Sequence, residues 1–277
     1  LVAGTFEQST VFGKAGDPAT TSAGGTDGFL ALYDSMNELS WSTTFGGSGS
    51  EGIAGSVDMD ADFGSGRAYV AGTTTSTGFT IGSTMMPTGT TGYLAQINPD
   101  GMITWAKGFN TGTYPVHVAS STLGPYVATT VQASVDMGGG PLAAFGGNDI
   151  VVAHFDSHGT YLWSKIFGGT GDQSCASIAA DSSGLLMGCN YAAAFTLSNG
   201  QTLPSPAVPG GGAFVMKLDG DGAIVWAHAQ GGEAPTVALD GQDFAIMTGG
   251  FFGSSDFGGG AVAPVGATDF FLGKLGK

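Results

Sequence analysis

One segment returns along the chain about every 60 residues, and this repetition constrains the fold more than any other feature. Its first copy, residues 29–45, reads Phe-Leu-Ala-Leu-Tyr-Asp, a turn, and then Leu-Ser-Trp-Ser-Thr-Thr-Phe. Related copies occupy residues 93–109, 150–167 and 214–228, and a fifth first half stands at residues 270–275. Periodic self-similarity of this kind builds a fold from copies of one structural unit. The chain is therefore predicted to be an array of similar units.

Each unit contains four strand-like segments, such as residues 55–58, 68–73, 29–34 and 39–45. Within a segment, apolar residues alternate or form short runs, and aromatic and β-branched residues are frequent, as is typical of strands. Turn-forming residues separate the third and fourth segments, as in Asn-Pro-Asp-Gly at residues 98–101. No segment shows the three- and four-residue spacing of a helix face. The sequence predicts an all-β protein.

Tryptophan recurs at one place in the unit, with spacings of 64, 58 and 63 residues: Trp41, Trp105, Trp163 and Trp226. Four short antiparallel strands per unit, with an aromatic residue at a fixed place, are typical of propeller blades. An indole at that place buries a large area against the neighbouring blade. We therefore predict a β-propeller of four-stranded antiparallel blades, about five in number, with these tryptophans as structural residues buried between blades.

The first unit lacks the first of its four segments, and the last unit lacks the fourth. The segments then amount to 18 strands, or four and a half blades. We expect residues 1–277 to form a single propeller domain, and the missing strands leave open whether it is a piece of a longer polypeptide. Unpaired strand edges are templates for another strand. We expect closure within one polypeptide to complete the end blades, and strand donation by a neighbouring subunit is the alternative.

The repeat resembles a known family. Asp-Gly-Phe-Leu-Ala-Leu-Tyr-Asp from residue 27, followed by Leu-Ser-Trp-Ser-Thr-Thr-Phe-Gly-Gly-Ser-Gly, is similar to the bacterial SBBP-type β-propeller repeat. Residues 147–189 resemble it still more closely, and the likeness is weakest at residues 110–125, where Ser121 replaces an aspartate. The resemblance covers nearly the whole chain. It implies a secreted or surface-located propeller, often inside a larger protein, and it carries no shared catalytic residues.

The charge of the chain narrows its partners. The formal net charge is −15, with only seven Lys and Arg residues, which argues against nucleic acid because phosphate binding depends on those cations. No apolar run approaches the ~20 residues of a membrane-spanning helix, and no leader peptide is visible. We expect an extracellular or cell-surface protein whose partner is a protein, a glycan or another copy of itself.

Three carboxylates at alternate positions, Asp58, Asp60 and Asp62, precede Gly64. Calcium loops use such spacing because a hard cation requires several oxygens from one short turn. The glutamate that usually follows such a loop is absent. The segment is a weak calcium candidate, and an ordinary hairpin turn is the alternative that we favour.

Histidines align with residues of other kinds in the other units. His154 shares its place with Gln96, Lys217 and Lys274, which predicts a solvated strand face. His117 falls on the innermost strand and is a weak candidate for a binding residue. No Cys-x-x-Cys metal spacing exists.

The two cysteines, Cys175 and Cys189, lie on successive strand segments joined by a turn at residues 181–184. A three-residue loop would place them directly opposite, whereas a two-residue loop would turn them to different faces. A disulfide is a candidate, and the alternative is two free thiols.

No motif for a nucleophile or a phosphate loop is present in the setting it requires. We therefore expect a non-enzymatic propeller that serves as a structural, interaction or adhesion module. The alternatives are a carbohydrate-active or other hydrolytic propeller with acids at one rim, and a calcium-stabilised adhesive domain. Two acids about 5–10 Å apart in a deep pocket would favour the hydrolytic alternative.

Overall fold

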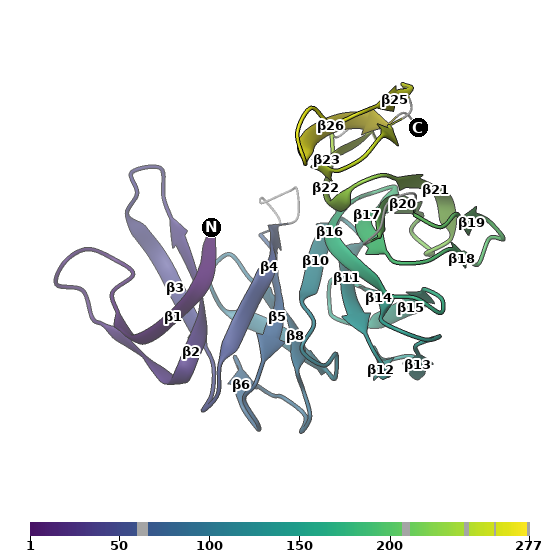
Figure 1. Ribbon diagram of the computed structural model, residues 1–277. Helices are drawn as coiled ribbons and strands as arrows, with labels where there is room; N and C mark the ends of the chain where they lie inside the picture. The colour runs from purple at the N-terminus through teal and green to yellow at the C-terminus, as the bar shows by residue number, and fades with distance from the viewer. Residues whose placement is uncertain (60–65, 207–210, 241–243, 258, 276–277) are drawn as a thin grey trace. The chain divides into compact units, whose positions relative to one another are not determined.

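The computed structural model describes residues 1–59, 66–206, 211–240, 244–257 and 259–275. In these residues all regular structure is β-strand, and no helix is present (Figure 1). Eighteen strands form five main sheets, in each of which strands pair in the order of the chain. The all-β prediction is therefore confirmed, and the five main sheets contain the expected number of strands.

The first sheet has three strands: β1 (Val2–Thr10), β2 (Thr20–Tyr33) and β3 (Leu39–Phe45). The second has four: β4 (Glu51–Met59), β5 (Ala68–Thr74), β8 (Gly92–Ile97) and β9 (Ile103–Phe109). The third also has four: β10 (Val116–Ser121), β11 (Gly124–Val131), β14 (Asp149–Phe155) and β15 (Tyr161–Phe167). The fourth consists of β16 (Gln173–Asp181), β17 (Gly184–Tyr191), β20 (Gly212–Leu218) and β21 (Ile224–Gln230). The fifth consists of β22 (Glu233–Leu239), β23 (Ala245–Phe251) and β26 (Asp269–Leu275).

Four short two-stranded ribbons lie in the loops between the second and third strands of sheets two to five. They are β6 (Thr80–Ile81) with β7 (Thr84–Met85), β12 (Ser134–Asp136) with β13 (Pro141–Ala143), β18 (Phe195–Thr196) with β19 (Thr202–Leu203), and β24 (Ser255–Asp256) with β25 (Ala261–Val262). The sequence predicts these segments as loops. The ribbons nevertheless contribute to the core, since Ile81, Val135 and Leu203 are buried.

Burial differs between the strands of a sheet. Strands β8, β14 and β20 are buried along their whole length, whereas β15 and β21 alternate between buried or half-buried and exposed residues near their starts. A short continuous apolar run is the pattern of a strand covered on both faces. The second strands, β5, β11 and β17, are buried almost as completely. The second and third strands therefore form the core of each four-stranded sheet, and the fourth strands lie nearer the surface.

The turns before the fourth strands are closed by aspartate or asparagine side chains, as the sequence predicts. Asn98 Oδ1 accepts hydrogen bonds from the backbone N–H groups of Asp100 and Met102 at 3.1 and 2.8 Å. Asp219 makes the same pair of bonds at 3.0 and 2.8 Å with Asp221 and Ala223. Such side chains hold a tight turn because they replace a backbone acceptor.

The chain forms two compact units, one of residues 1–118 with 157–160, and one of residues 119–156 with 161–277. In the first unit, Leu30 of the first sheet packs with Val70 and Tyr93 of the second. In the second unit, the third sheet packs with the fourth, and Val215 of the fourth sheet packs with Met247 and Phe271 of the fifth. Face-to-face packing of consecutive sheets therefore builds the core of each unit.

Candidate functional site

The recurring tryptophans hold the turns of following sheets. Three of the indoles donate hydrogen bonds at 2.7, 3.3 and 2.8 Å to backbone carbonyls in the turns before β9, β15 and β21: Trp41 to Pro99, Trp105 to Ser157 and Trp163 to Gly220. These side chains are half-buried rather than fully buried as predicted. Their repeated role is therefore to fasten a turn as well as to fill space.

A glycine lies under each of these rings. Gly101, Gly159 and Gly222 have φ values of +81°, +78° and +74°, a conformation that favours glycine. A Cβ atom added at these positions would lie 2.5, 2.9 and 2.8 Å from the indole of Trp41, Trp105 and Trp163, respectively. The turn glycine is thus required by both backbone conformation and close approach.

Trp226, the fourth tryptophan, is also half-buried and packs against the cluster that contains Val237 and Met247 of the fifth sheet. Its ring centroid is 5.2 Å from that of His228, an exposed histidine. The other three indoles bond to the turn that follows the third strand of the next sheet. In the fifth sheet that turn lies after Leu275, outside the described residues.

The prediction that His154 lies on a solvated strand face is wrong. The side chain is 2% exposed, and its ring stacks on that of Tyr126 with centroids 4.0 Å apart and planes 7° apart. Trp163 meets the same imidazole edge-on at 5.7 Å. His154 is therefore part of a buried aromatic cluster in the third sheet.

Burial also changes how this cluster titrates. The pKa of His154 is lowered to about 4 because burial disfavours the imidazolium, although the Gly220 backbone and the Asp156 carboxylate oppose the shift. Burial likewise raises the pKa of Tyr126 to about 12, with help from the charge of Asp181. Both side chains are thus held neutral near pH 7.

The position of His154 on the third strand holds a buried polar side chain in two other sheets as well. Gln96 is 5% exposed and donates hydrogen bonds to the Tyr69 hydroxyl at 3.0 Å and to the Ser157 carbonyl at 2.7 Å. Lys217 is 7% exposed and lies 3.3 Å from a carboxylate oxygen of Asp181. The place holds a polar side chain whose partner differs from sheet to sheet.

Two of the three aspartates of the calcium candidate lie outside the described residues. Asp58 lies on β4, half-buried and opposite Tyr69, while Asp60 and Asp62 are outside the described residues. Within the described part of the chain, no group of three or more His, Cys, Asp and Glu side chains has the arrangement of a metal site.

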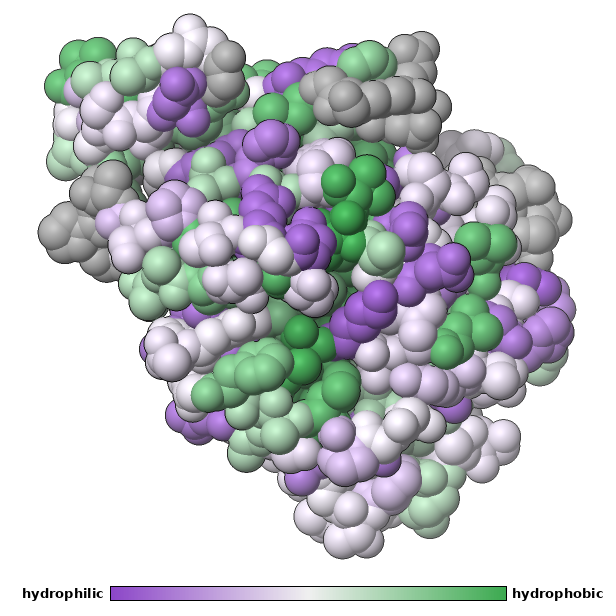
Figure 2. Space-filling model, turned by 90° about the vertical axis from the view of Figure 1, so that its right-hand side faces the viewer, coloured by the Kyte–Doolittle hydropathy of each residue, from purple (hydrophilic) through white to green (hydrophobic). Residues whose placement is uncertain are grey.

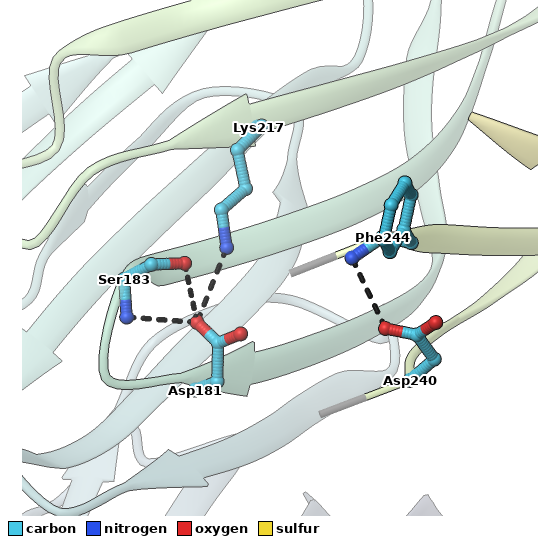
Figure 3. A network of polar contacts seen from close by, with 5 residues as sticks. All are labelled: Asp181, Ser183, Lys217, Asp240 and Phe244. Carbon is cyan, nitrogen blue, oxygen red and sulfur yellow. Dashed lines mark hydrogen bonds and ion pairs between the residues drawn. The ribbon is translucent and has the colours of Figure 1, made fainter. Parts of the chain in front are cut away.

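The equivalent turn aspartates in the fourth and fifth sheets bind lysine and the turn itself. Asp181 accepts hydrogen bonds from the Ser183 amide and hydroxyl at 2.8 and 2.6 Å (Figure 3). Burial raises its pKa, but the Ser183 bonds and the Lys217 charge outweigh that effect, so the net pKa is lowered. Asp240 accepts from the Phe244 amide at 3.2 Å (Figure 3) and from Lys274 at 2.6 Å. In both turns the aspartate is thus paired with a lysine from the third strand of the same sheet.

His117, the other predicted binding residue, lies on β10 and is half-buried. Val116 and Val118 beside it are buried. The polar cavity described below does not include His117 among its lining residues.

A β-bulge brings the two cysteines together. The turn after β16 has two residues, since Asp181 pairs with Gly184, and an unbroken ladder would place Asn190 opposite Cys175. An irregularity between Cys175 and Ser177 shifts the register by one residue, so Cys175 faces Cys189 instead. Their Sγ atoms are 3.0 Å apart.

A polar cavity of about 340 Å³ lies in the second unit, at the starts of β16 and β22. Its lining includes Asn148, Asp172, Gln173, Asn190, Tyr191 and Glu233. Gln173 is 1% exposed, and its Oε1 accepts the Gly169 N–H at 3.0 Å, which fixes the orientation of the amide. Its Nε2 has no hydrogen-bond partner among the described residues. We refer to this feature as the polar cavity.

Sequence reasoning missed a set of aspartates, on β2, β14 and β26, that accept a hydrogen bond from the backbone N–H four residues earlier. Asp149 is 0% exposed and accepts hydrogen bonds from Phe145 and Gly169, and burial raises its pKa. Asp27 and Asp269 accept the N–H four residues earlier in the same way, at 2.8 and 2.6 Å. The signal was available, because an aspartate precedes the third strand in three of the five copies.

One face of the fifth sheet is left bare. Phe270 and Leu272 of β26 are 88% and 78% exposed. The residues equivalent to Leu272 in the other four sheets are each 0% exposed: Leu30, Leu94, Val152 and Val215. We call the surface formed by Phe270, Leu272 and the neighbouring Thr248 of β23 the open face.

Other exposed apolar residues are dispersed. On the surface shown in Figure 2, hydrophobic residues form small patches separated by hydrophilic ones. Scattered patches of this size are ordinary for a folded protein and need no partner. Phe270 and Leu272 differ because they lie next to each other on the same side of β26. The equivalent positions in the other sheets are buried.

Comparison with known proteins adds no relative. No protein-family model matches the chain, and a search of curated proteins finds no match. No helix in the described residues is long and apolar enough to span a membrane.

Proposed function

We propose that this chain is a non-enzymatic binding module built as a β-propeller of about five SBBP-type blades. Five consecutive sheets of the same strand order support the propeller, as does the recurring contact of an indole with the turn of the following sheet. Short antiparallel sheets repeated in this way are the units of propellers. The resemblance of the repeat to SBBP-type propellers supports a secreted or surface location.

The exposed apolar side chains of the open face are the observation that supports a binding role. In the three pairs of sheets that pack within one unit, the residue equivalent to Leu272 lies in a core cluster with the following sheet, as Leu30, Val152 and Val215 do. Leaving a Phe and a Leu side chain in water forgoes about 1.5–3 kcal/mol of burial each. A partner that covers Phe270 and Leu272 recovers this free energy.

The occupant that we propose is another sheet of the same repeat. Such a sheet presents buried third-strand residues like Tyr93 and Ala95, which pack with Leu30 in the first unit. A repeat sheet therefore fits the open face by the packing that the chain already uses. Repeat proteins bury such faces by adding a further repeat.

Replacing Phe270 and Leu272 together by lysine tests this proposal. The variant is compared with wild type and with Val225→Lys, a change at a residue of β21 that is 58% exposed. Mass by light scattering and melting temperature are measured over a wide range of protein concentration.

Dilution identifies the source of the covering sheet. If it comes from a second copy, wild type associates and melts at a concentration-dependent temperature, and only the double variant is monomeric. If it comes from the same chain, all proteins are monomers and only the double variant melts several degrees lower. Equal melting temperatures and masses for all three proteins would contradict the proposal.

The polar cavity favours a second candidate, the recognition or hydrolysis of a carbohydrate. Asp172 and Glu233 line the same cavity, and the Gln173 amide adds a buried donor that has no partner among the described residues. Paired acids are the groups that glycosidases use. Release of reducing sugar from soluble polysaccharides by wild type, lost in Glu233→Gln, would support this candidate, and no release by wild type would count against hydrolysis.

A further inference from the structure

The two cysteines of the chain have the geometry of an unformed cross-strand bond. Cys175 of β16 and Cys189 of β17 face each other in the antiparallel register, with Sγ atoms 3.0 Å apart. Facing residues of antiparallel strands have Cα atoms about 4.5–5.5 Å apart, a separation that a disulfide spans. An approach of about 1 Å brings the sulfurs to the bonded length of about 2.05 Å.

The pair also lies at an irregularity of the sheet. Strand β16 is an edge strand of the fourth sheet, so it has a hydrogen-bonded neighbour on one side. The bulge between Cys175 and Ser177 interrupts its ladder to β17 at this point. A bulge leaves a residue unpaired and disrupts the ladder locally. A covalent link here would hold an edge strand where its hydrogen bonding is weakest.

We propose that Cys175 and Cys189 are joined by a disulfide when the protein meets an oxidising thiol–disulfide pool, and that this bond locks β16 onto β17. The thiolate of Cys175 attacks an exogenous disulfide, such as oxidised glutathione, and displaces one thiol. The thiolate of Cys189 then attacks the mixed disulfide and displaces the second thiol. The chain gives up two protons and two electrons, and one exogenous disulfide becomes two thiols.

The different environments of the two thiols set the order of these steps. Cys175 is half-buried, whereas Cys189 is 0% exposed and packs within the core cluster that contains Phe214 and Tyr191. Burial, together with the neighbouring Cys175 thiol, raises the pKa of Cys189. Since the thiolate is the reactive form, Cys175 reacts first. Oxidation of the folded protein is therefore slow compared with oxidation while the chain folds.

The first test counts thiols in the whole chain. Reduced protein is unfolded, refolded in a buffer of oxidised and reduced glutathione, and then acid-quenched, denatured and titrated with a thiol reagent. We expect no reactive thiol and a mass lower than that of the reduced protein by two hydrogen atoms. Two reactive thiols in the refolded protein, or glutathione retained on either cysteine, would overturn the proposal.

The second test measures what the bond does for stability. Cys175 and Cys189 are 14 residues apart in the chain, and closing a loop of this size lowers the unfolding equilibrium constant by on the order of a hundredfold. Oxidised and reduced wild type are unfolded in guanidinium chloride, beside Cys175→Ser/Cys189→Ser with and without reductant. Reduction should lower the midpoint of wild type and leave that of the variant unchanged.

A local readout separates the proposed lock from a general effect. Amide hydrogen exchange of residues 173–181 should accelerate on reduction more than exchange of residues 224–230, on the opposite edge strand of the sheet. Equal midpoints for oxidised and reduced wild type would overturn the inferred lock. This wild-type comparison still decides the matter if the double variant does not fold, and it does not depend on the proposed function.

Discussion

At the scale of single residues, His154 links the stability of the chain to pH. The pKa of His154 is about 4 in the folded chain, whereas an unfolded histidine titrates near 6.5. Between these values the unfolded chain binds more protons, so the stabilisation is complete above about pH 6.5 and is lost as the pH falls toward 4. One pKa unit corresponds to about 1.4 kcal/mol, so the loss is roughly 3 kcal/mol.

Replacing His154 by glutamine should remove this dependence. Gln96 occupies the same place in the second sheet and donates to the Tyr69 hydroxyl, so an amide is compatible with the site. We expect His154→Gln to lose less stability than wild type between pH 7.5 and 4.5 in urea unfolding. His158→Gln, a change in an exposed turn, should behave as wild type. An unchanged pH dependence in His154→Gln would contradict the assignment.

Gly222 tests the contact between an indole and a turn. In Gly222→Ala the new Cβ lies 2.8 Å from the Trp163 ring, and the φ of +74° is unfavourable for alanine. The matched control is Gly200→Ala, where φ is +85° and no atom lies within 4 Å of the new Cβ. The control isolates backbone strain of about 1–2 kcal/mol, and overpacking should add about 1–3 kcal/mol in Gly222→Ala.

Guanidinium unfolding measures both glycine variants, and the fluorescence of the native state reports on the environment of the tryptophans. Equal losses of stability in the two variants would show that the Trp163 contact does not constrain the turn.

The mistaken hypothesis about His154 has a physical origin. Lysines at the equivalent place suggested solvent, yet Lys217 is buried along its stem and reaches Asp181 at the end of its own sheet. Long cationic side chains can bury their methylenes and keep the head paired or wet. A lysine in a repeat therefore does not mark an exposed face by itself.

At the scale of strands and turns, two lysines in equivalent places allow a matched comparison. The side chain of Lys217 is 9% exposed in its pair with Asp181, whereas that of Lys274 is 52% exposed in its pair with Asp240. Removing one partner of a buried pair leaves an uncompensated charge and costs up to about 3–5 kcal/mol. An exposed pair contributes about 0–1 kcal/mol.

We therefore expect Lys217→Met to destabilise the chain by about 2 kcal/mol or more and Lys274→Met by less than about 1 kcal/mol. Urea unfolding at neutral pH measures the difference. Similar losses in the two variants would mean that burial of the Lys217 pair does not determine its contribution.

The main strands were predictable in number and order because each is long enough to show a pattern, although β2 begins at Thr20, well before the predicted segment at residues 29–34. Residues 39–45 and 68–73 match β3 and β5 within one residue. The ribbons were not predictable, since two- or three-residue strands such as β18 have no periodicity to detect. The facing of Cys175 and Cys189 was also beyond the sequence, because a bulge of one residue reverses the register that the turn alone would set.

At the scale of the whole molecule, composition argues against one class of partner and does not identify a function. Seven basic residues in a chain of net charge −15 argue against phosphate binding. The open face and the polar cavity came from neither composition nor motif. The open face and the polar cavity both depend on which side of a strand a side chain occupies and on which residues cover that side. A single sequence does not specify these contacts between sheets.

Cooperativity of unfolding distinguishes a single propeller from two independent units. Leu30 belongs to a core cluster in the first unit and Met216 to one in the second, and both are 0% exposed. Replacing either by alanine should cost about 2–5 kcal/mol, because it opens a cavity in a packed core. If the sheets are blades of one propeller, wild type unfolds in a single calorimetric transition, and both variants lower that transition.

Calorimetry of wild type, Leu30→Ala and Met216→Ala makes the measurement, and the calorimetric and van't Hoff enthalpies should agree for a single cooperative transition. Two transitions, of which Leu30→Ala moves one and Met216→Ala the other, would contradict a single domain. The open face, which is exposed in the second unit, would then have to be covered by another molecule. The dependence of the wild-type melting temperature on protein concentration, and its absence in the Phe270 and Leu272 variant, tests that case.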